Sequence, residues 1–226
     1  CIEQIQRALQ DDSSLELSFQ SIRPVNGATW GDYFEILTRI RRSDDSLMQP
    51  GQFLPIAEQV DIVRSFDRTV IRKVIHWLDQ HMQQDHRRKL CSINLSLDSM
   101  LDHTLPCYIQ HLLAASELPP EKLCFELNEC HVINHWDKAV SCVAALRKLG
   151  CQMAVDRVGS AHTDFSYLAK LDVNFVKIDG NLIQQVETDP IARVLVETIQ
   201  KIASLTGKQT IAEFVENQST LRDVRK

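Results

Sequence analysis

Residues 123–158 read LCFELNECHVINHWDKAVSCVAALRKLGCQMAVDRV. Residues 123–127 and 152–158 are short apolar runs of strand length. Residues 137–149, between them, place apolar side chains at helical spacing, and Gly150 then provides a helix stop. Two strands joined by a helix can lie parallel, with the helix packed on one face of the sheet. This segment therefore predicts an α/β fold built on a parallel sheet.

The same alternation of strands and helices extends over the whole chain. The expected strands are residues 15–22, 33–40, 90–95, 123–127, 152–158, 174–178 and 210–215. The expected helices are residues 53–59, 67–81, 105–115, 137–149, 165–171 and 191–205, with a last helix from residue 218 onward. A short connection joins the first two strands as a hairpin, and a helix follows each of the others. No linker divides the chain, so we expect one domain.

Bulk composition narrows the function classes. The chain has 226 residues, a net charge of −5 and no basic block, so nothing in its charge favours binding to duplex nucleic acid. No run of about 18 apolar residues occurs, so no membrane span is expected, and no signal peptide opens the chain. Its seven cysteines form no Cys-x-x-Cys pair, which favours reduced thiols in a cytoplasmic protein.

Polar side chains recur on strands that should be apolar on both faces if they were simply buried. The recurring residues are Glu35, Asn94, Glu126, Asp156, Lys177 and Glu213. A surface position or an ion pair would explain any one of them alone, but recurrence on successive strands favours a shared site at the strand ends. Carboxylate and amide oxygens suit hard divalent cations, and a lysine among them can hold a phosphate or a water. The pattern predicts a divalent-metal and phosphate site.

Short motifs in a fixed order also carry a family resemblance. They are residues 35–39 (EILTR), 50–58 (PGQFLPIAE), 94–96 (NLS), 126–129 (ELNE), 156–159 (DRVG), 177–179 (KID) and 212–216 (AEFVE). In these motifs the chain resembles the EAL domain, the bacterial cyclic di-GMP phosphodiesterase family. The resemblance covers essentially the whole chain.

The resemblance implies a modified TIM (β/α)8 barrel whose first strand is antiparallel. An eighth strand and the helix after it are missing from the chain as given, which ends at Lys226. A single EAL-type barrel over residues 1–226 is expected. Residues 1–12 are a candidate linker helix from an upstream domain, because the chain opens abruptly at Cys1 with a helical pattern. An upstream GGDEF or sensor domain and a homodimer are the partners that the resemblance leaves open.

In active relatives, two Mg²⁺ or Mn²⁺ ions activate a water that cleaves cyclic di-GMP to linear pGpG. By resemblance, the first metal would be held by Glu35, Asn94, Glu126 and Asp156. The catalytic set would be Lys177 beside the attacking water, Glu213 completing the metal site and Glu216 supporting it. The residues contacting cyclic di-GMP would be Gln20, Leu37, Arg39 and Asp179.

Four departures from the family pattern affect this site. Ile36 replaces an alanine, Phe214 replaces a glycine, and the loop at residues 160–164 lacks the usual glycine and serine pair. The most consequential departure is Arg157, which replaces the second aspartate of an Asp-Asp-Phe-Gly motif. At about 4 Å and an effective dielectric of about 20, one unit-charge pair is worth about 4 kcal/mol. A cation at this position therefore opposes binding of a second metal.

These departures favour a degenerate EAL domain that acts as a cyclic di-GMP receptor in bacterial second-messenger signalling, with little or no hydrolysis. Arg157 itself is then a candidate phosphate ligand. Two alternatives remain open: a weakly active, metal-dependent phosphodiesterase that produces pGpG, and a protein-interaction scaffold that binds no ligand. The number of metal ions that the chain binds is therefore also open: it could be two Mg²⁺ or Mn²⁺ ions, one ion or none.

Overall fold

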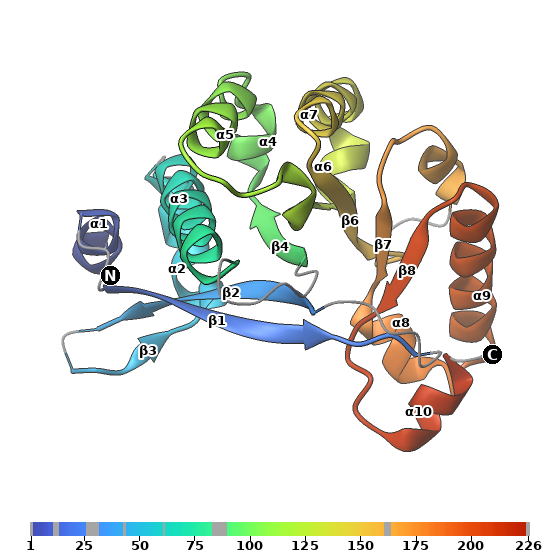
Figure 1. Ribbon diagram of the computed structural model, residues 1–226. Coiled ribbons are helices and arrows are strands. Elements are labelled where there is room, and N and C mark those ends of the chain that lie inside the picture. Colours follow the sequence, from blue (N-terminus) through green and yellow to red (C-terminus); the bar gives the residue numbers. More distant parts are fainter. Residues whose placement is uncertain are drawn as a thin grey trace.

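The strands of the computed structural model form one curved mixed sheet in the order β1-β2-β4-β5-β6-β7-β8, with β3 beside β2 (Figure 1). The structure describes residues 2–10, 14–25, 32–42, 44–60, 62–82, 90–160 and 164–224. The strands are β1 (Leu15–Ile22), β2 (Tyr33–Arg41), β3 (Leu47–Met48), β4 (Leu90–Leu95), β5 (Leu123–Asn128), β6 (Gln152–Val158), β7 (Phe175–Ile178) and β8 (Gln209–Ala212).

Helices surround this sheet. They are α1 (Ile2–Gln10), α2 (Pro50–Gln59), α3 (Val63–Met82), α4 (Leu97–Leu101), α5 (Leu105–Ala114), α6 (Glu129–Asn134), α7 (Trp136–Lys148), α8 (Gly180–Gln185), α9 (Pro190–Leu205) and α10 (Gln218–Asp223), with 3-10 turns η2 (Pro120–Lys122) and η3 (Phe165–Ala169). Figure 1 shows α3, α5, α7 and α9 around the fan of β4 to β8, with the β1–β2 pair crossing beneath it. Across the described residues, no helix combines the length and apolar character needed to cross a membrane.

The predicted antiparallel first strand and parallel sheet are confirmed. β1 is antiparallel to β2, and each further pair from β2–β4 to β7–β8 is parallel. The sheet therefore curves as a half-barrel with an antiparallel first strand. In the part of the chain that the structure describes, β1 and β8 end this path of strands, and β3 pairs with β2 alone.

Three expectations about element bounds are corrected. β8 ends at Ala212, so Glu213 follows the strand instead of lying within it. Residues 165–169 form a 3-10 turn where a short α-helix was expected. Helix α2 begins at Pro50, because proline lacks an amide hydrogen and its fixed φ suits a helix start.

The register sorts the strand residues into two faces. Gln20 lies opposite Glu35, so both side chains point to the concave side of the sheet. One layer deeper, the concave side is closed by a small cluster of buried Tyr33, Cys124, Ala154 and Phe175. Alternation along each strand then places the polar strand residues in the layer above this cluster. The sheet thereby brings the residues singled out by the sequence onto one surface.

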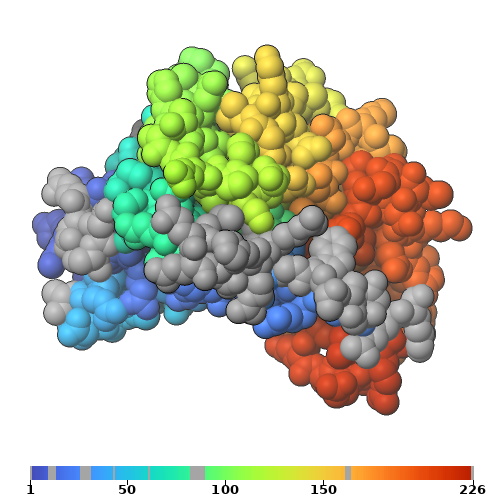
Figure 2. All heavy atoms as spheres, viewed as in Figure 1, coloured from blue at the N-terminus to red at the C-terminus, as the bar shows by residue number. Residues whose placement is uncertain are grey.

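The main apolar core lies on the other, convex face of the sheet. Phe53 and Ile71 on the helices pack with Ile40 and Ile93 on the strands, and all four are fully or almost fully buried. In the space-filling view of Figure 2, side chains fill the gaps that the ribbon leaves between α3, α5 and α7. Helix α1 also buries an apolar residue, Ile5, in this core. The helix is therefore packed on the fold, and a linking role for it stays a prediction.

Candidate functional site

The ammonium group of Lys177 lies at the centre of four carboxylates. Its Nζ atom is 2.7 Å from Glu126 Oε2, 2.8 Å from Glu35 Oε2, 3.1 Å from Glu213 Oε1 and 3.5 Å from Asp156 Oδ1. The lysine side chain is 2% exposed. Five positions up to 178 residues apart in the chain therefore meet at one cation, and we call these five residues the Lys177 cluster.

Two details of the Lys177 cluster bear on its chemistry. Asn94 on β4 donates from Nδ2 to Glu35 Oε1 at 2.7 Å, so both oxygens of Glu35 have a partner. The second oxygen of Glu126, Oε1, is buried and has no hydrogen-bond partner among the described residues. A buried, unpartnered carboxylate oxygen costs free energy, so Glu126 is suited to take up a proton or a cation.

Burial and neighbouring charges shift the pKa values in this cluster. Burial raises the pKa of Glu126 to about 8, with Glu35 and Asp156 adding to the rise and Lys177 opposing it. Burial also raises the pKa of Glu213. Burial alone would lower the pKa of Lys177, but the surrounding carboxylates outweigh it and raise that pKa. Lys177 therefore stays charged at neutral pH, while Glu126 holds its proton to higher pH than an exposed glutamate does.

A raised pKa for an acid makes stability fall as pH rises, because the folded state holds a proton that the unfolded state has released. We expect the free energy of unfolding of the wild-type chain, relative to Glu126→Gln, to fall between about pH 5 and pH 8. One fully released proton corresponds to a slope of about 1.4 kcal/mol per pH unit. Urea denaturation in the presence of EDTA measures it. The exposed Glu117→Gln serves as control, and an identical slope in wild type and Glu126→Gln would contradict the assignment.

The predicted ligand residues Gln20, Leu37 and Arg39 lie on the β1–β2 pair, on the same face as Glu35. Arg39 is four residues beyond Glu35, which places it about 13 Å further along the strand. Its Nη1 donates to the carbonyl of Thr38 at 2.8 Å. The hairpin therefore forms a wall that begins at the Lys177 cluster and leads away from it.

The EAL domain model matches residues 2–226 of this chain. The chain belongs to the EAL domain family. It is 32% identical to the cyclic di-GMP phosphodiesterase PdeB of Shewanella oneidensis over 213 residues, covering 93% of this chain and 24% of that protein. It is 28% identical to the cyclic di-GMP phosphodiesterase PdeF of Escherichia coli, covering 88% of this chain and 27% of that protein. The chain thus spans about a quarter of the length of these relatives.

A solved structure is also similar to this EAL domain. The FimX EAL domain from Pseudomonas aeruginosa, bound to c-di-GMP, superposes with a TM-score of 0.89 at 27% identity. The match covers 99% of this chain and 88% of that one. The half-barrel with its antiparallel first strand is therefore the EAL fold.

The donor chemistry of this EAL domain suits a hard divalent cation. As they stand, the described residues contain no group of three histidine, cysteine or acidic side chains placed to hold a metal, and the Lys177 ammonium lies between the acids. Glu126 Oε1 nevertheless offers a buried oxygen without a partner. A bound Mg²⁺ or Mn²⁺ would take oxygen ligands from Glu35, Asn94, Glu126 and Asp156 and would lower the pKa of a coordinated water.

Arg157 occupies a bulge in β6. The register between β6 and β7 shifts between Val155 and Val158, and Arg157 has a left-handed φ of 58°. Its backbone nitrogen donates to Asp156 Oδ1 at 2.9 Å, and its Nε lies 3.9 Å from Asp156 Oδ2. The Arg157 side chain is 63% exposed. Asp156 therefore has a buried cation, Lys177, on one side and an exposed cation on the other.

Two predicted site residues have other surroundings. Asp179 is buried at the start of α8, where Oδ1 accepts from the backbone and side-chain nitrogens of Asn181 at 2.9 and 3.0 Å. Glu216 is exposed beyond β8. None of the interactions described for this EAL domain joins either residue to the Lys177 cluster. Their roles toward ligand and metal stay predictions.

Glu129 is a buried acid for which the sequence motifs predicted no role. It is fully buried, and its carboxylate accepts from Gly159 N at 3.0 Å and from the Tyr167 hydroxyl at 2.6 Å. It thereby ties α6 to the segment that follows Arg157. An acid placed directly after a predicted strand was the available signal. In the loop at residues 160–164, which departs from the family pattern, residues 161–163 lie outside the described residues.

Phe214 follows Glu213 at the end of β8 and has a left-handed φ of 50°. Phe214 is 58% exposed, and its ring lies against Gly180, the first residue of α8. A Cβ atom at position 180 would be 2.0 Å from Phe214 Cδ2. The aromatic ring at this edge of the site therefore depends on the glycine beneath it.

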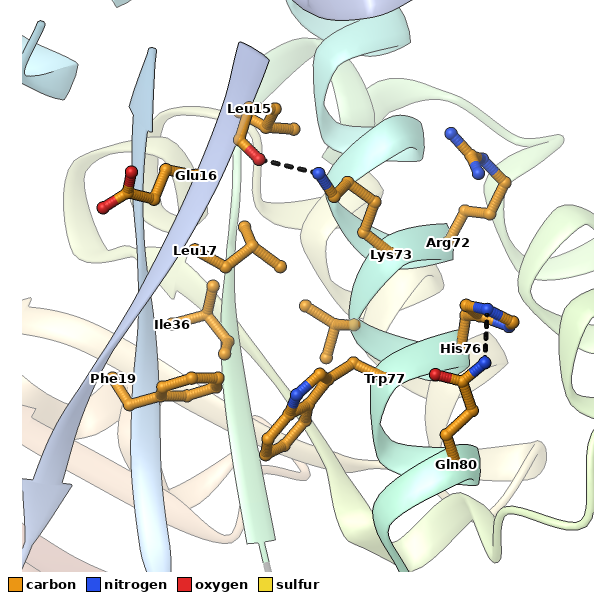
Figure 3. A pocket seen from close by; sticks show the side chains of 11 residues that line it. Leu15, Glu16, Leu17, Phe19, Ile36, Arg72, Lys73, His76, Trp77 and Gln80 are labelled. Carbon is orange, nitrogen blue, oxygen red and sulfur yellow. Dashed lines mark hydrogen bonds between the residues drawn. The ribbon is translucent and has the colours of Figure 1, made fainter. Parts of the chain in front are cut away.

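A groove of about 410 Å³ lies between β1 and α3 (Figure 3). Phe19 and Trp77 form its apolar part, with ring centroids 4.7 Å apart, and His76 and Arg72 lie along α3 beside them. Phe19 points away from the face that carries Gln20. The groove is therefore on the opposite side of the sheet from the Lys177 cluster.

Proposed function

We propose that this EAL domain is a receptor module that binds cyclic di-GMP and hydrolyses it little or not at all. The observation that carries the proposal is the position of Asp156 between two cations. Lys177 Nζ is 3.5 Å and Arg157 Nε is 3.9 Å from its carboxylate oxygens. A metal ion next to Asp156 on the exposed side would face the Arg157 guanidinium.

Charge also supports ligand binding at this face. Cyclic di-GMP carries two phosphodiester charges, and four carboxylates around a single ammonium would repel it. Arg39 on the hairpin wall and Arg157 on the β6 bulge bring two further cations to the same face. Guanidinium groups bind phosphate oxygens through paired hydrogen bonds, which suits them to a compact phosphate ligand.

A metal-dependent phosphodiesterase that releases pGpG is the second candidate. Its support is the complete Lys177 cluster together with Asn94, which would hold one divalent ion. The Shewanella and Escherichia relatives are named cyclic di-GMP phosphodiesterases. One retained ion would give slower turnover than two, because a second ion stabilises the attacking and leaving oxygens together.

Calorimetric titration with cyclic di-GMP, followed by chromatography of the same mixture for pGpG, separates these functions. Intact ligand bound at micromolar or tighter affinity, with and without Mg²⁺ or Mn²⁺, is the expected result. Formation of pGpG that is lost in Glu35→Ala and kept in the exposed Glu117→Ala would make the protein an enzyme. Absence of binding in every buffer would leave a scaffold that engages only other proteins.

A homodimer is proposed through helix α9. Ile191, Val194 and Leu205 on this helix are 70%, 58% and 78% exposed. Apolar residues along one exposed helix surface favour an interface over a solvated face. Sedimentation velocity should give a dimer that Val194→Lys converts to monomer; a monomeric wild-type chain at high protein concentration would exclude this interface. An upstream GGDEF or sensor domain stays a prediction.

A further inference from the structure

Arg157 is held in place by its backbone. The bulge between Val155 and Val158 turns the strand at this point, and the amide hydrogen of Arg157 is fixed on Asp156 Oδ1. A left-handed backbone is unfavourable for arginine, so the surrounding structure must stabilise it. Bulges of this kind redirect a side chain next to a functional site. The backbone therefore fixes the point at the end of β6 from which the Arg157 side chain extends.

The Arg157 guanidinium makes no hydrogen bond to any of the residues that the structure describes. In the described residues, the side-chain contact of Arg157 is the 3.9 Å approach of Nε to Asp156, which is longer than a hydrogen bond. Its side chain is 63% exposed, while the Lys177 side chain across Asp156 is 2% exposed. The buried cation is fully engaged by carboxylates, and the exposed one is available to an incoming anion.

We infer that Arg157 supplies a fixed cation to a phosphate group of the bound cyclic dinucleotide, so that ligand binding does not require a divalent metal ion. The inference rests on the proposed receptor function. A metal ion exchanges with the solution and is removed by a chelator, whereas a guanidinium is part of the chain and stays charged at every physiological pH. Arg157 would form paired hydrogen bonds to a phosphate oxygen pair, which Lys177 cannot do from its buried position.

The test compares cyclic di-GMP affinity in excess EDTA and in excess Mg²⁺. The wild-type chain should bind equally well in both. Arg157→Asn removes the charge but keeps a residue that tolerates a left-handed φ, and it should lose about ten- to hundredfold in affinity in EDTA. Mg²⁺ should recover part of that loss. Arg157→Lys, which keeps the charge without the planar fork, should fall between the two.

The matched control is Arg64→Asn. Arg64 is also exposed, at 55%, and also makes one long ion pair, with Asp102 at 4.0 Å, but on helix α3 outside the concave face. Its affinity should equal that of the wild type in both buffers, and thermal melting confirms that each variant is folded. A wild-type affinity that collapses in EDTA, or an Arg157→Asn variant that binds like wild type there, would overturn the inference.

The outcomes also separate this inference from the function on which it rests. If the wild-type chain binds in neither buffer, the receptor function is wrong and the inference falls with it. If Mg²⁺ causes conversion to pGpG, the receptor function is wrong but the EDTA titration still decides the role of Arg157. The metal dependence is the informative readout, because a merely structural arginine would weaken binding equally in both buffers.

Discussion

Lys177→Met should lower the free energy of unfolding by about 3 to 5 kcal/mol in metal-free buffer, the usual consequence of removing one partner from a buried ion pair. The substitution keeps most of the side-chain volume but leaves four carboxylates facing one another without the ammonium at 2.7 to 3.5 Å from each. Some of these acids must then take up protons, so the loss should grow as pH rises. Urea denaturation with EDTA present measures the change.

The same denaturation experiment is then repeated with a divalent ion in place of EDTA. Mn²⁺ should restore part of the lost stability in Lys177→Met, because an ion that binds only the folded state stabilises it and can take the position of the ammonium. The exposed Lys201→Met on α9 is the control and should stay within about 0.5 kcal/mol of wild type. Equal stability of Lys177→Met and wild type would show that the cluster is not held together by its lysine.

Arg39→Ala should weaken cyclic di-GMP binding by at least about thirtyfold, since truncating one partner of a hydrogen-bonded charge pair costs about 2 to 5 kcal/mol. Arg39 lies on the face of β2 that carries Glu35, and within the described parts of the chain its guanidinium donates to the neighbouring carbonyl of Thr38. Isothermal titration of the folded variant measures the loss.

Arg41→Ala is the matched control for this variant. Arg41 is two residues further along the same strand and is paired with Glu16. Its removal should change the affinity much less, because its charge is already engaged within the hairpin. Equal losses in the two variants would mean that the hairpin contributes only general positive charge, and an unchanged affinity in Arg39→Ala would remove this residue from the ligand site.

The sequence predicted those helices and strands that are long enough to show a regular spacing of apolar residues. Seven strands and the antiparallel first pair follow from apolar runs and connection lengths. Helices α4, α6 and α8 have five or six residues, fewer than two turns, so no apolar period marks them. The two-residue β3 is formed by its pairing with β2, which no local pattern in the sequence indicates.

The sequence predicted which residues belong to the candidate site, but it did not predict the distances between them. Alternation places Glu35, Glu126 and Lys177 on the concave face, and that follows from the sequence alone. The distances do not, because they depend on the relative positions of separate strands. The left-handed φ of Arg157 could not be predicted either, because an arginine in the sequence does not indicate a left-handed backbone. Asp179 could be predicted near a strand end, but its capping of α8 depends on a helix that the sequence did not reveal.

The contact between Phe214 and Gly180 constrains how this pair of positions can change during evolution. With the ring in place, any side chain at position 180 meets it at 2.0 Å, so Gly180→Ala is unfavourable until position 214 becomes small. With an alanine at position 180, a phenylalanine at position 214 could not adopt this orientation, because its ring would clash with the alanine Cβ atom. The two positions are therefore epistatic, and the order of substitution matters: the glycine has to come first.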